Sequence, residues 1–127
     1  MVDRVVATDA AAAVIERLKR LHGPLMFHQS GGCCDGSSPM CYPDGEFRVG
    51  GVDVRLGAIC GSPFWMWSDQ YAYFANSQLI IDVVPGRGAG FSLESPEGVR
   101  FITRSRVFND AEADELALQA PLPRGGS

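Results

Sequence analysis

The segment from Leu79 to Val84 constrains the fold most, because β-branched and other apolar residues follow one another there almost without interruption. A short run of this kind favours a strand over a helix, and the glycines that follow it from Gly86 to Gly90 break the strand. Strands that are buried on both faces have this composition, whereas half-exposed strands alternate apolar with polar residues. We therefore expect residues 79–84 to form a central strand.

Helices are expected near both ends of the chain. Residues 8–21 place apolar side chains at helical spacing, and Thr8 stands at the position of an N-cap. The expected apolar face comprises Ala10, Val14, Leu18 and Leu21. The sequence His22-Gly23-Pro24 ends this helix, because glycine accepts the left-handed cap and proline cannot continue the helix. A second helix is expected from Asp110 to about Gln119, with Asn109 as its N-cap.

Further strands and a short helix over residues 70–75, capped by Ser68 or Asp69, are expected between these helices. The strands cover residues 25–28, 91–94 and 99–108, and residues 47–56 predict a hairpin that turns at Gly50-Gly51. Alternation in its second arm places Val52, Val54, Leu56, Ala58 and then Cys60 on one inward face. These elements predict an α+β fold, with a mainly antiparallel or mixed β-sheet and a helix at each end. Residues 1–120 are expected to form a single domain, and residues 121–127 a disordered tail.

The net charge of the 127-residue chain is −4, which argues against nucleic acid as a partner. Binding to DNA or RNA needs a clustered basic surface that displaces counterions from phosphates. No secretory signal is visible at the N-terminus, and no apolar run approaches the ~18 residues that a membrane span requires. We therefore expect a cytoplasmic protein whose cysteines are thiols or metal ligands rather than disulfides.

The most distinctive chemical feature is the segment from Gly31 to Cys41, which reads Gly-Gly-Cys-Cys-Asp-Gly-Ser-Ser-Pro-Met-Cys. Buried structural cysteines usually stand in periodic apolar segments, whereas Cys33, Cys34 and Cys41 stand among turn-forming residues. Such a loop presents consecutive backbone N–H groups, which stabilise thiolates and sulfur-bound clusters. Thiolate-rich sites favour zinc, iron–sulfur clusters or copper(I). We therefore expect the loop to bind a metal.

The expected metal ligands are Cys33, Cys34, Cys41, Cys60 and His28. Cys60 is the natural distant ligand because strand alternation places it inward, and His28, just before the loop, is a reserve ligand. The spacing departs from the usual zinc signature, in which cysteines come as Cys-x2–4-Cys pairs. Adjacent residues of an extended strand point to opposite faces, so one of Cys33 and Cys34 binds and the other packs unless the backbone turns.

Three other interpretations of the cysteines stay open. Cys33 or Cys34 is a nucleophile with His28 as its base, although the sequence identifies no acidic residue to orient the histidine. Alternatively, Cys33 and Cys34 form a redox-sensitive disulfide, which is strained between neighbouring residues. In the third interpretation Cys34 and Cys60 are simply buried. The corresponding functions are a thiol-dependent redox protein or enzyme, and a structural module that binds a partner.

From Thr8 to Phe108 the chain resembles the bacterial family called domain of unknown function 779. The segments that carry the resemblance are residues 27–41, Phe-His-Gln-Ser-Gly-Gly-Cys-Cys-Asp-Gly-Ser-Ser-Pro-Met-Cys, and residues 90–98, Gly-Phe-Ser-Leu-Glu-Ser-Pro-Glu-Gly. The resemblance implies no particular activity. Members of this family are often encoded beside aldehyde dehydrogenases, which implies such an enzyme as a partner.

The order of elements is more distantly similar to that of the HesB-like A-type iron–sulfur assembly proteins. Those proteins have an initial helix, a strand, a Gly-Gly-Cys loop, a hairpin and a Gly-Phe-x-x-x-x-Pro segment. Gly32-Cys33, Gly90-Phe91 and Pro96 match these features here. The resemblance implies a HesB-like architecture. The chain lacks the Cys-Gly-Cys pair that those proteins carry near the C-terminus, so cluster transfer does not follow from the fold.

Together these features predict a small cytoplasmic accessory protein without enzymatic activity. It is expected to bind a metal or an iron–sulfur cluster through the Gly-Gly-Cys-Cys loop and to assist an aldehyde dehydrogenase. An unpaired edge strand and the aromatic residues from Phe64 to Phe74 also favour a homodimer.

Overall fold

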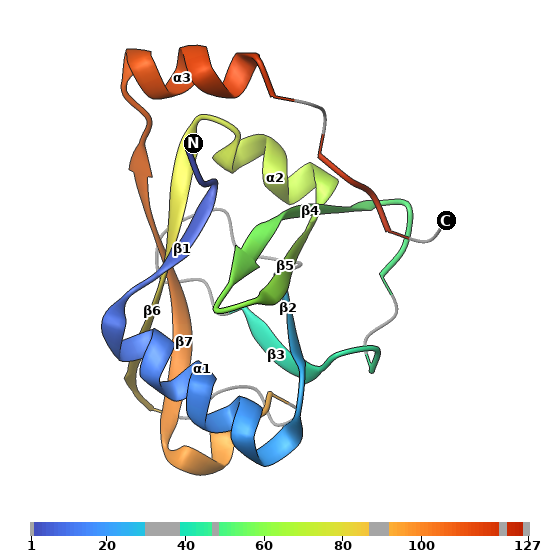
Figure 1. Ribbon diagram of the computed structural model, residues 1–127, viewed down its shortest axis with the longest axis vertical. Helices are drawn as coiled ribbons and strands as arrows, with labels where there is room; N and C mark the ends of the chain where they lie inside the picture. The colour runs from blue at the N-terminus through green and yellow to red at the C-terminus, as the bar shows by residue number, and fades with distance from the viewer. Residues whose placement is uncertain (1, 30–38, 47–48, 87–91, 120–121, 126–127) are drawn as a thin grey trace.

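The computed structural model describes residues 2–29, 39–46, 49–86, 92–119 and 122–125. In these ranges the chain forms strands, α-helices and a short 3-10 helix (Figure 1). The strands are β1 (Val5–Ala7), β2 (Leu25–Gln29), β3 (Met40–Pro43), β4 (Asp53–Ile59), β5 (Ser62–Trp67), β6 (Ser77–Pro85) and β7 (Val99–Val107). The helices are α1 (Asp9–His22), α2 (Ser68–Phe74), α3 (Asp110–Ala117) and the 3-10 helix η1 (Ser95–Glu97).

The described strands form two mixed sheets. In the first, β6 lies between β1, to which it is parallel, and β7, to which it is antiparallel. In the second, the order is β3-β2-β5-β4, with β2 and β5 parallel and the outer pairs antiparallel. Residues 79–84 are therefore central, as their composition predicts, and the expected α+β class is confirmed. The HesB-like assignment stays a prediction.

The core lies between the two sheets and beneath α1, and it is built around Phe27 of β2. The Phe27 ring stacks beside Phe64 of β5, with ring centroids 6.2 Å apart, and meets Phe101 of β7 edge-on at 5.4 Å. All three side chains are fully buried. Burial of each is worth roughly 1.5–3 kcal/mol, so this aromatic cluster joins the two sheets into one core.

Helix α1 covers the core with a face that differs in part from the expected one. Thr8 is the N-cap, as predicted, and its side chain accepts the N–H of Ala11 at 3.1 Å. The buried residues of the helix are Ala11, Val14, Ile15 and Leu18. Ala10 and Leu21 are exposed instead, because the buried face centres nearer to Ile15, a large apolar residue that the expected set left out.

The expected hairpin over residues 47–56 is wrong, because β4 pairs with the strand that follows it. β4 and β5 are antiparallel and are joined at Cys60 and Gly61, which have positive φ angles of 50° and 77°. A two-residue turn of type I′ needs positive φ at both positions, and glycine adopts it without strain. Residues 49–52 precede β4 without forming a strand, and residues 47 and 48 lie outside the described ranges.

The same hairpin overturns the inward placement expected for Cys60. A register shift between Arg55 and Gly57 interrupts the alternation of β4. Val54 and Leu56 are buried as predicted, but Val52, which precedes the strand, is exposed. Beyond the shift Ile59 is buried and Ala58 is exposed. Cys60 therefore lies half-buried in the turn after the strand.

Three further segments differ from expectation. Ser92 to Glu94, within the strand expected over residues 91–94, form a turn that leads into η1, and residue 91 is not described. Helix α2 begins at Ser68 without a side-chain cap. Pro123 to Gly125, within the expected tail, lie along β4, where the Pro123 carbonyl accepts the N–H of Arg55 at 2.8 Å.

No helix in the described ranges has the length and apolar character to cross a membrane.

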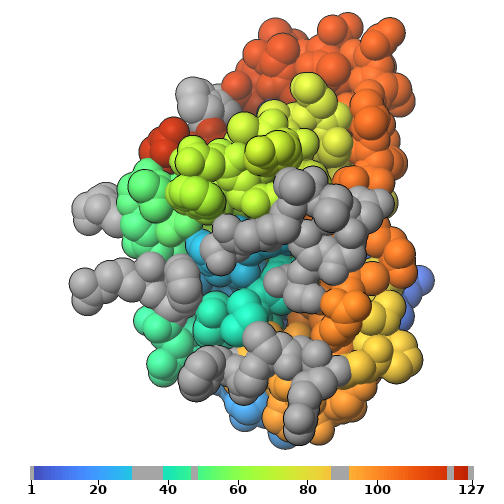
Figure 2. Space-filling model, turned by 180° about the vertical axis from the view of Figure 1, so that it is seen from behind, coloured from blue at the N-terminus to red at the C-terminus, as the bar shows by residue number. Residues whose placement is uncertain are grey.

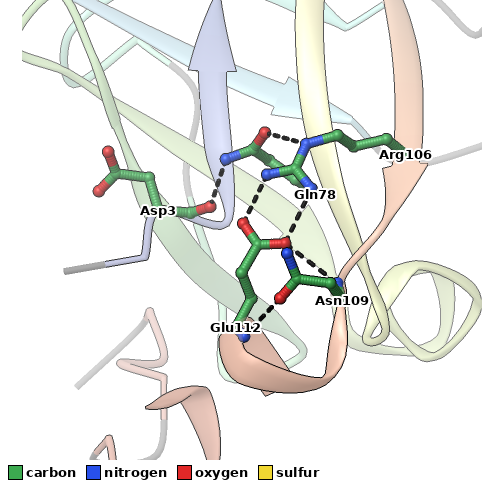
Figure 3. Close-up of polar contacts among 5 residues, drawn as sticks. All are labelled: Asp3, Gln78, Arg106, Asn109 and Glu112. Carbon is green, nitrogen blue, oxygen red and sulfur yellow. Dashed lines mark hydrogen bonds and ion pairs between the residues drawn. The ribbon is translucent and has the colours of Figure 1, made fainter. Parts of the chain in front are cut away.

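Helix α3 is fixed to the end of the first sheet by the polar contacts drawn in Figure 3. Asn109 and Glu112 form a capping box, in which each side chain accepts the backbone N–H of the other residue. Arg106 of β7 donates to the Glu112 carboxylate at 2.8 and 2.6 Å, and to Gln78 of β6 at 3.0 Å. Gln78 in turn donates to the carbonyl of Asp3 at 2.9 Å. The helix and its cap are as predicted, although the helix ends at Ala117.

Candidate functional site

The first predicted site residue in the described ranges is His28. It lies in β2, where its neighbours across the sheet are Met40 of β3 and Trp65 of β5. Successive side chains of a strand point to opposite faces, so His28 points away from the core face that holds Phe27. The His28 side chain is nevertheless buried, with the residue only 4% exposed. A buried imidazole needs hydrogen-bond partners, and β4 supplies one.

Asp53, the first residue of β4, is that partner. Its Oδ1 atom lies 2.7 Å from Nε2 of His28, and the aspartate is itself only 5% exposed. The Oδ2 atom accepts the N–H of Gly50 at 2.9 Å, and the Asp53 N–H donates to the Gly50 carbonyl at 3.0 Å. The turn before β4 therefore holds the carboxylate in place, and the carboxylate orients the imidazole.

This contact sets the role of one ring nitrogen of His28. An ionised carboxylate only accepts hydrogen bonds, so Nε2 is the donor in its contact with Asp53. Carboxylate–histidine pairs of this kind orient imidazoles that bind metals, and they also orient imidazoles that act as general bases. The His28–Asp53 pair therefore suits either role.

The strand that carries His28 ends one residue later, at Gln29, and Cys33 and Cys34 follow at the fourth and fifth positions beyond Gln29 in the sequence. Gln29 is fully buried on the core face, where its Oε1 atom accepts the hydroxyl of Thr103 in β7. The end of β2 is therefore anchored to the first sheet. Cys33 and Cys34, which are two of the predicted metal ligands, lie outside the described residues.

Cys41, in β3, belongs to the core rather than to the surroundings of His28. It pairs with Phe27, and the neighbouring Met40 pairs with His28, so the Cys41 thiol and the His28 imidazole point to opposite faces of the sheet. Burial, with a smaller contribution from the Glu94 carboxylate, raises the pKa of the Cys41 thiol. Without a metal the buried thiol therefore favours its protonated form near neutral pH.

Two buried polar residues that sequence reasoning missed, Ser92 and Glu94, hold the strand that carries Cys41. The Ser92 hydroxyl accepts the Cys41 N–H at 2.9 Å and donates to the Glu94 carboxylate. The Cys41 carbonyl accepts the N–H of Leu93 at 3.0 Å. Burial raises the pKa of Glu94, although the hydrogen bonds from Ser92 and from the Phe101 N–H act in the opposite direction. These contacts give Ser92 and Glu94 a structural role. Both belong to residues 90–98, one of the two segments that carry the resemblance to the domain of unknown function 779.

Cys60 lies in a third environment, at the far end of β4 from Asp53. A strand advances about 3.3 Å per residue, so roughly 20 Å of strand separates Cys60 from the His28–Asp53 pair. The Cys60 carbonyl accepts a hydrogen bond from Nζ of Lys19 in α1 at 2.8 Å. Partial burial and the Glu16 carboxylate raise the pKa of the Cys60 thiol, and Lys19 opposes them. Cys60 and His28 therefore cannot bind the same metal ion.

The described residues do not bring the predicted ligands together. His28, Cys41 and Cys60 occupy three separate environments, and no group of three potential ligands suited to a metal occurs within the described ranges. What the structure adds is Asp53, which sequence reasoning missed as a partner of His28. A signal for it existed, because strand alternation places Asp53 on the face opposite the apolar Val54.

Comparison with known protein families finds a match that covers most of the chain. A sequence model of the family described as a domain of unknown function (DUF779) matches residues 14–107. The chain belongs to the DUF779 family. The matched range of this DUF779 protein includes β2 to β7, and with them the His28–Asp53 pair, Cys41 and Cys60. No curated protein and no solved structure matches the chain.

Proposed function

We propose that this DUF779 protein is a small cytoplasmic metal-binding accessory protein in which His28 supplies an imidazole ligand and the loop cysteines supply thiolates. The observation that carries the proposal is the buried contact between His28 and Asp53. Imidazoles that bind metals almost always donate their other N–H to a carboxylate, a carbonyl or water. A buried carboxylate in this position is costly unless it is paired, and pairing with a ligand histidine is a functional reason to keep it.

The proposed donors are His28 with Cys33 or Cys34, rather than the full set of cysteines. His28 stands five positions before Cys33, so an extended chain keeps the two residues within about 17 Å. Cys41 is left out because its side chain lies on the core face of the sheet, opposite to His28, and Cys60 because it lies at the far end of β4. A mixed imidazole and thiolate set suits zinc, copper or an iron–sulfur cluster.

Metal affinity in matched variants tests this proposal. Protein purified without oxygen is expected to contain zinc, iron or copper in stoichiometric amount. The double variant Cys33→Ser/Cys34→Ser should lose the metal, and Asp53→Asn should weaken metal affinity roughly 10–100-fold. Cys60→Ser and Asp44→Asn, which change residues outside the proposed site, serve as controls and should retain the metal. Wild-type protein that lacks metal, or a double variant that retains it, would contradict the proposal.

A second candidate function is a thiol-dependent redox protein or enzyme, and the same contact favours it. In a cysteine–histidine arrangement the base is usually oriented by a third group, and Asp53 is in position to be that group. Here Cys33 or Cys34 is the nucleophile and His28 is its base. This function predicts rapid alkylation of one loop cysteine near neutral pH, slowed in Asp53→Asn, with no metal present. Uniformly slow alkylation in the metal-free protein would exclude it.

The proposed partner is an aldehyde dehydrogenase, and a homodimer is the proposed oligomeric state. The partner is supported by the family resemblance, which implies such enzymes as genomic neighbours. Co-purification of the full chain with the aldehyde dehydrogenase encoded beside it tests this part. Binding that persists in Cys33→Ser/Cys34→Ser would separate the interaction from the metal site. Sedimentation at several concentrations tests the homodimer, and a monomer throughout would contradict it.

A further inference from the structure

Two adjoining pockets lie where β1 meets α2 and α3, and neither is lined by His28 or Asp53. The first, which we call the Arg4 pocket, has a volume of about 470 Å³, and the second has a volume of about 450 Å³. Arg4, Ala75 and Leu116 line both. Figure 2 shows α2 and α3 next to each other at one end of the surface. Pockets that hold small molecules have volumes of about 300–1,000 Å³, so the Arg4 pocket is large enough for a ligand.

The guanidinium of Arg4 is incompletely satisfied. Its Nη1 atom donates to the carbonyl of Ala75 at 3.1 Å, and its Cζ atom lies 5.6 Å from the centroid of the Tyr71 ring. Its Nε atom has no acceptor among the described residues, and because this atom is buried, a ligand in the pocket would bind the guanidinium through its other nitrogens. Other arginines behave differently: the structure pairs Arg17, Arg104 and Arg106 with Glu97, Asp82 and Glu112. Within the described ranges no carboxylate pairs with Arg4.

The remaining walls of the Arg4 pocket are mostly apolar. Phe108 and Leu116 contribute side chains that are almost completely buried, and Val107, at the end of β7, is exposed. Ala113 and Ala117 of α3 are small, so they leave space beside the arginine. The contacts of Figure 3 hold α3 against β6 and β7, which keeps this wall in place. Arg4 is the one charged residue among the described residues that line the Arg4 pocket.

We propose that the Arg4 pocket binds a small monocarboxylic acid, with its carboxylate on Arg4 and its apolar body against Phe108 and Leu116. An arginine guanidinium is the side chain best matched to a carboxylate, because its N–H groups form a planar fork. A single cation in an apolar pocket suits one negative charge. The net charge of −4 on the chain disfavours a phosphate dianion at a site with so little positive charge. The proposal is independent of the metal site.

Titration of the full-length protein with hexanoate, followed by amide NMR, tests this site. Hexanoate is expected to shift the amide signals of Ala75, Phe108 and Leu116, whereas hexanol, which has the same chain without the charge, should bind at least about tenfold more weakly. Arg4→Gln should weaken hexanoate binding by a similar factor, and Arg4→Lys by less. Equal affinity for hexanoate and hexanol, or equal affinity in wild type and Arg4→Gln, would overturn the proposal.

A second pair of variants keeps the test independent of Arg4, whose replacement also removes the hydrogen bond to Ala75. Ala113→Leu fills the pocket from α3, and Ala111→Leu adds the same side chain to the helix at a residue that does not line it. Hexanoate binding is expected to be lost in the first and kept in the second. Unchanged binding in Ala113→Leu would overturn the proposal. A further result would also overturn the proposal: wild-type protein does not bind hexanoate, and the Ala113→Leu variant differs from wild type in oligomeric state. The pocket would then be an interface between copies of the chain.

Discussion

Nε2 of His28 in β2 and Oδ1 of Asp53 in β4 lie 2.7 Å apart, although β5 lies between these two strands in the sheet. The contact therefore depends on the register of two strand pairs, β2 with β5 and β5 with β4. It joins a histidine that precedes the cysteine loop in the sequence to a carboxylate that is already held by the Gly50 N–H. The proposed metal site is built outward from this pair.

Replacing Asp53 with alanine should lower the free energy of unfolding by about 2–4 kcal/mol, because it removes the buried carboxylate that contacts the buried imidazole of His28. Chemical denaturation measures the change. Asp44→Ala removes an exposed aspartate and should change the free energy of unfolding by no more than about 0.5 kcal/mol. Equal effects of the two substitutions would mean that the contact contributes nothing to stability.

The two thiols that the structure describes should differ in reactivity. In the variant Cys33→Ser/Cys34→Ser, Ellman's reagent at pH 8 should label Cys60, which is half-buried, and leave Cys41 unlabelled until the protein unfolds. Burial both blocks access to the Cys41 thiol and raises its pKa, so little thiolate forms. Mass spectrometry of the labelled protein assigns the sites. Rapid labelling of Cys41 in the folded protein would show that β3 is not packed as described.

Glu112 should titrate far below an ordinary glutamate. Its hydrogen bonds with Arg106 and the Asn109 N–H lower the pKa to about 2. Because the folded state binds this proton less tightly than the unfolded state, the contact stabilises α3 above pH 4.5, and this contribution is lost as the pH falls toward 2. NMR titration of the carboxyl carbon checks the pKa. It should rise toward 4.5 in Arg106→Gln and stay low in Arg104→Gln, whose arginine pairs with Asp82 instead.

Gly61→Ala should destabilise the protein by about 1–2 kcal/mol through backbone conformation alone. The φ angle of Gly61 is 77°, and the nearest atom to an added Cβ would be Nζ of Lys19 at 3.9 Å, which is an ordinary contact. Gly50→Ala is the control, since Gly50 lacks a positive φ and has open space around it. Thermal unfolding of both variants measures the difference. Equal melting temperatures would exclude the type I′ turn at Cys60-Gly61.

Elements whose signals are local were predictable from the sequence. The N-caps Thr8 and Asn109, the apolar run around Ile81 and the strand over residues 99–108 depend on neighbours within a few positions. The partner of β4 was not predictable in this way. Gly50-Gly51 and Cys60-Gly61 both offer a turn, and only the packing of β5 between β2 and β4 selects the second.

The candidate site was predictable only in part. His28 stood out because it precedes the cysteine loop, whereas Asp53 needed the three-dimensional register to bring it to the imidazole. Cys60 was misplaced because a one-residue shift in β4 cannot be read from alternation. Ser92 and Glu94 were missed because their roles depend on the burial of a turn against Cys41.

The central claim, that His28 is a metal ligand beside the loop thiolates, is tested most directly by X-ray absorption spectroscopy of the zinc-loaded protein. The account predicts a mixed first shell, with nitrogen at about 2.0–2.1 Å and sulfur at about 2.3 Å, and loss of the imidazole scattering in His28→Ala. A shell of sulfur alone, unchanged in His28→Ala, would contradict it.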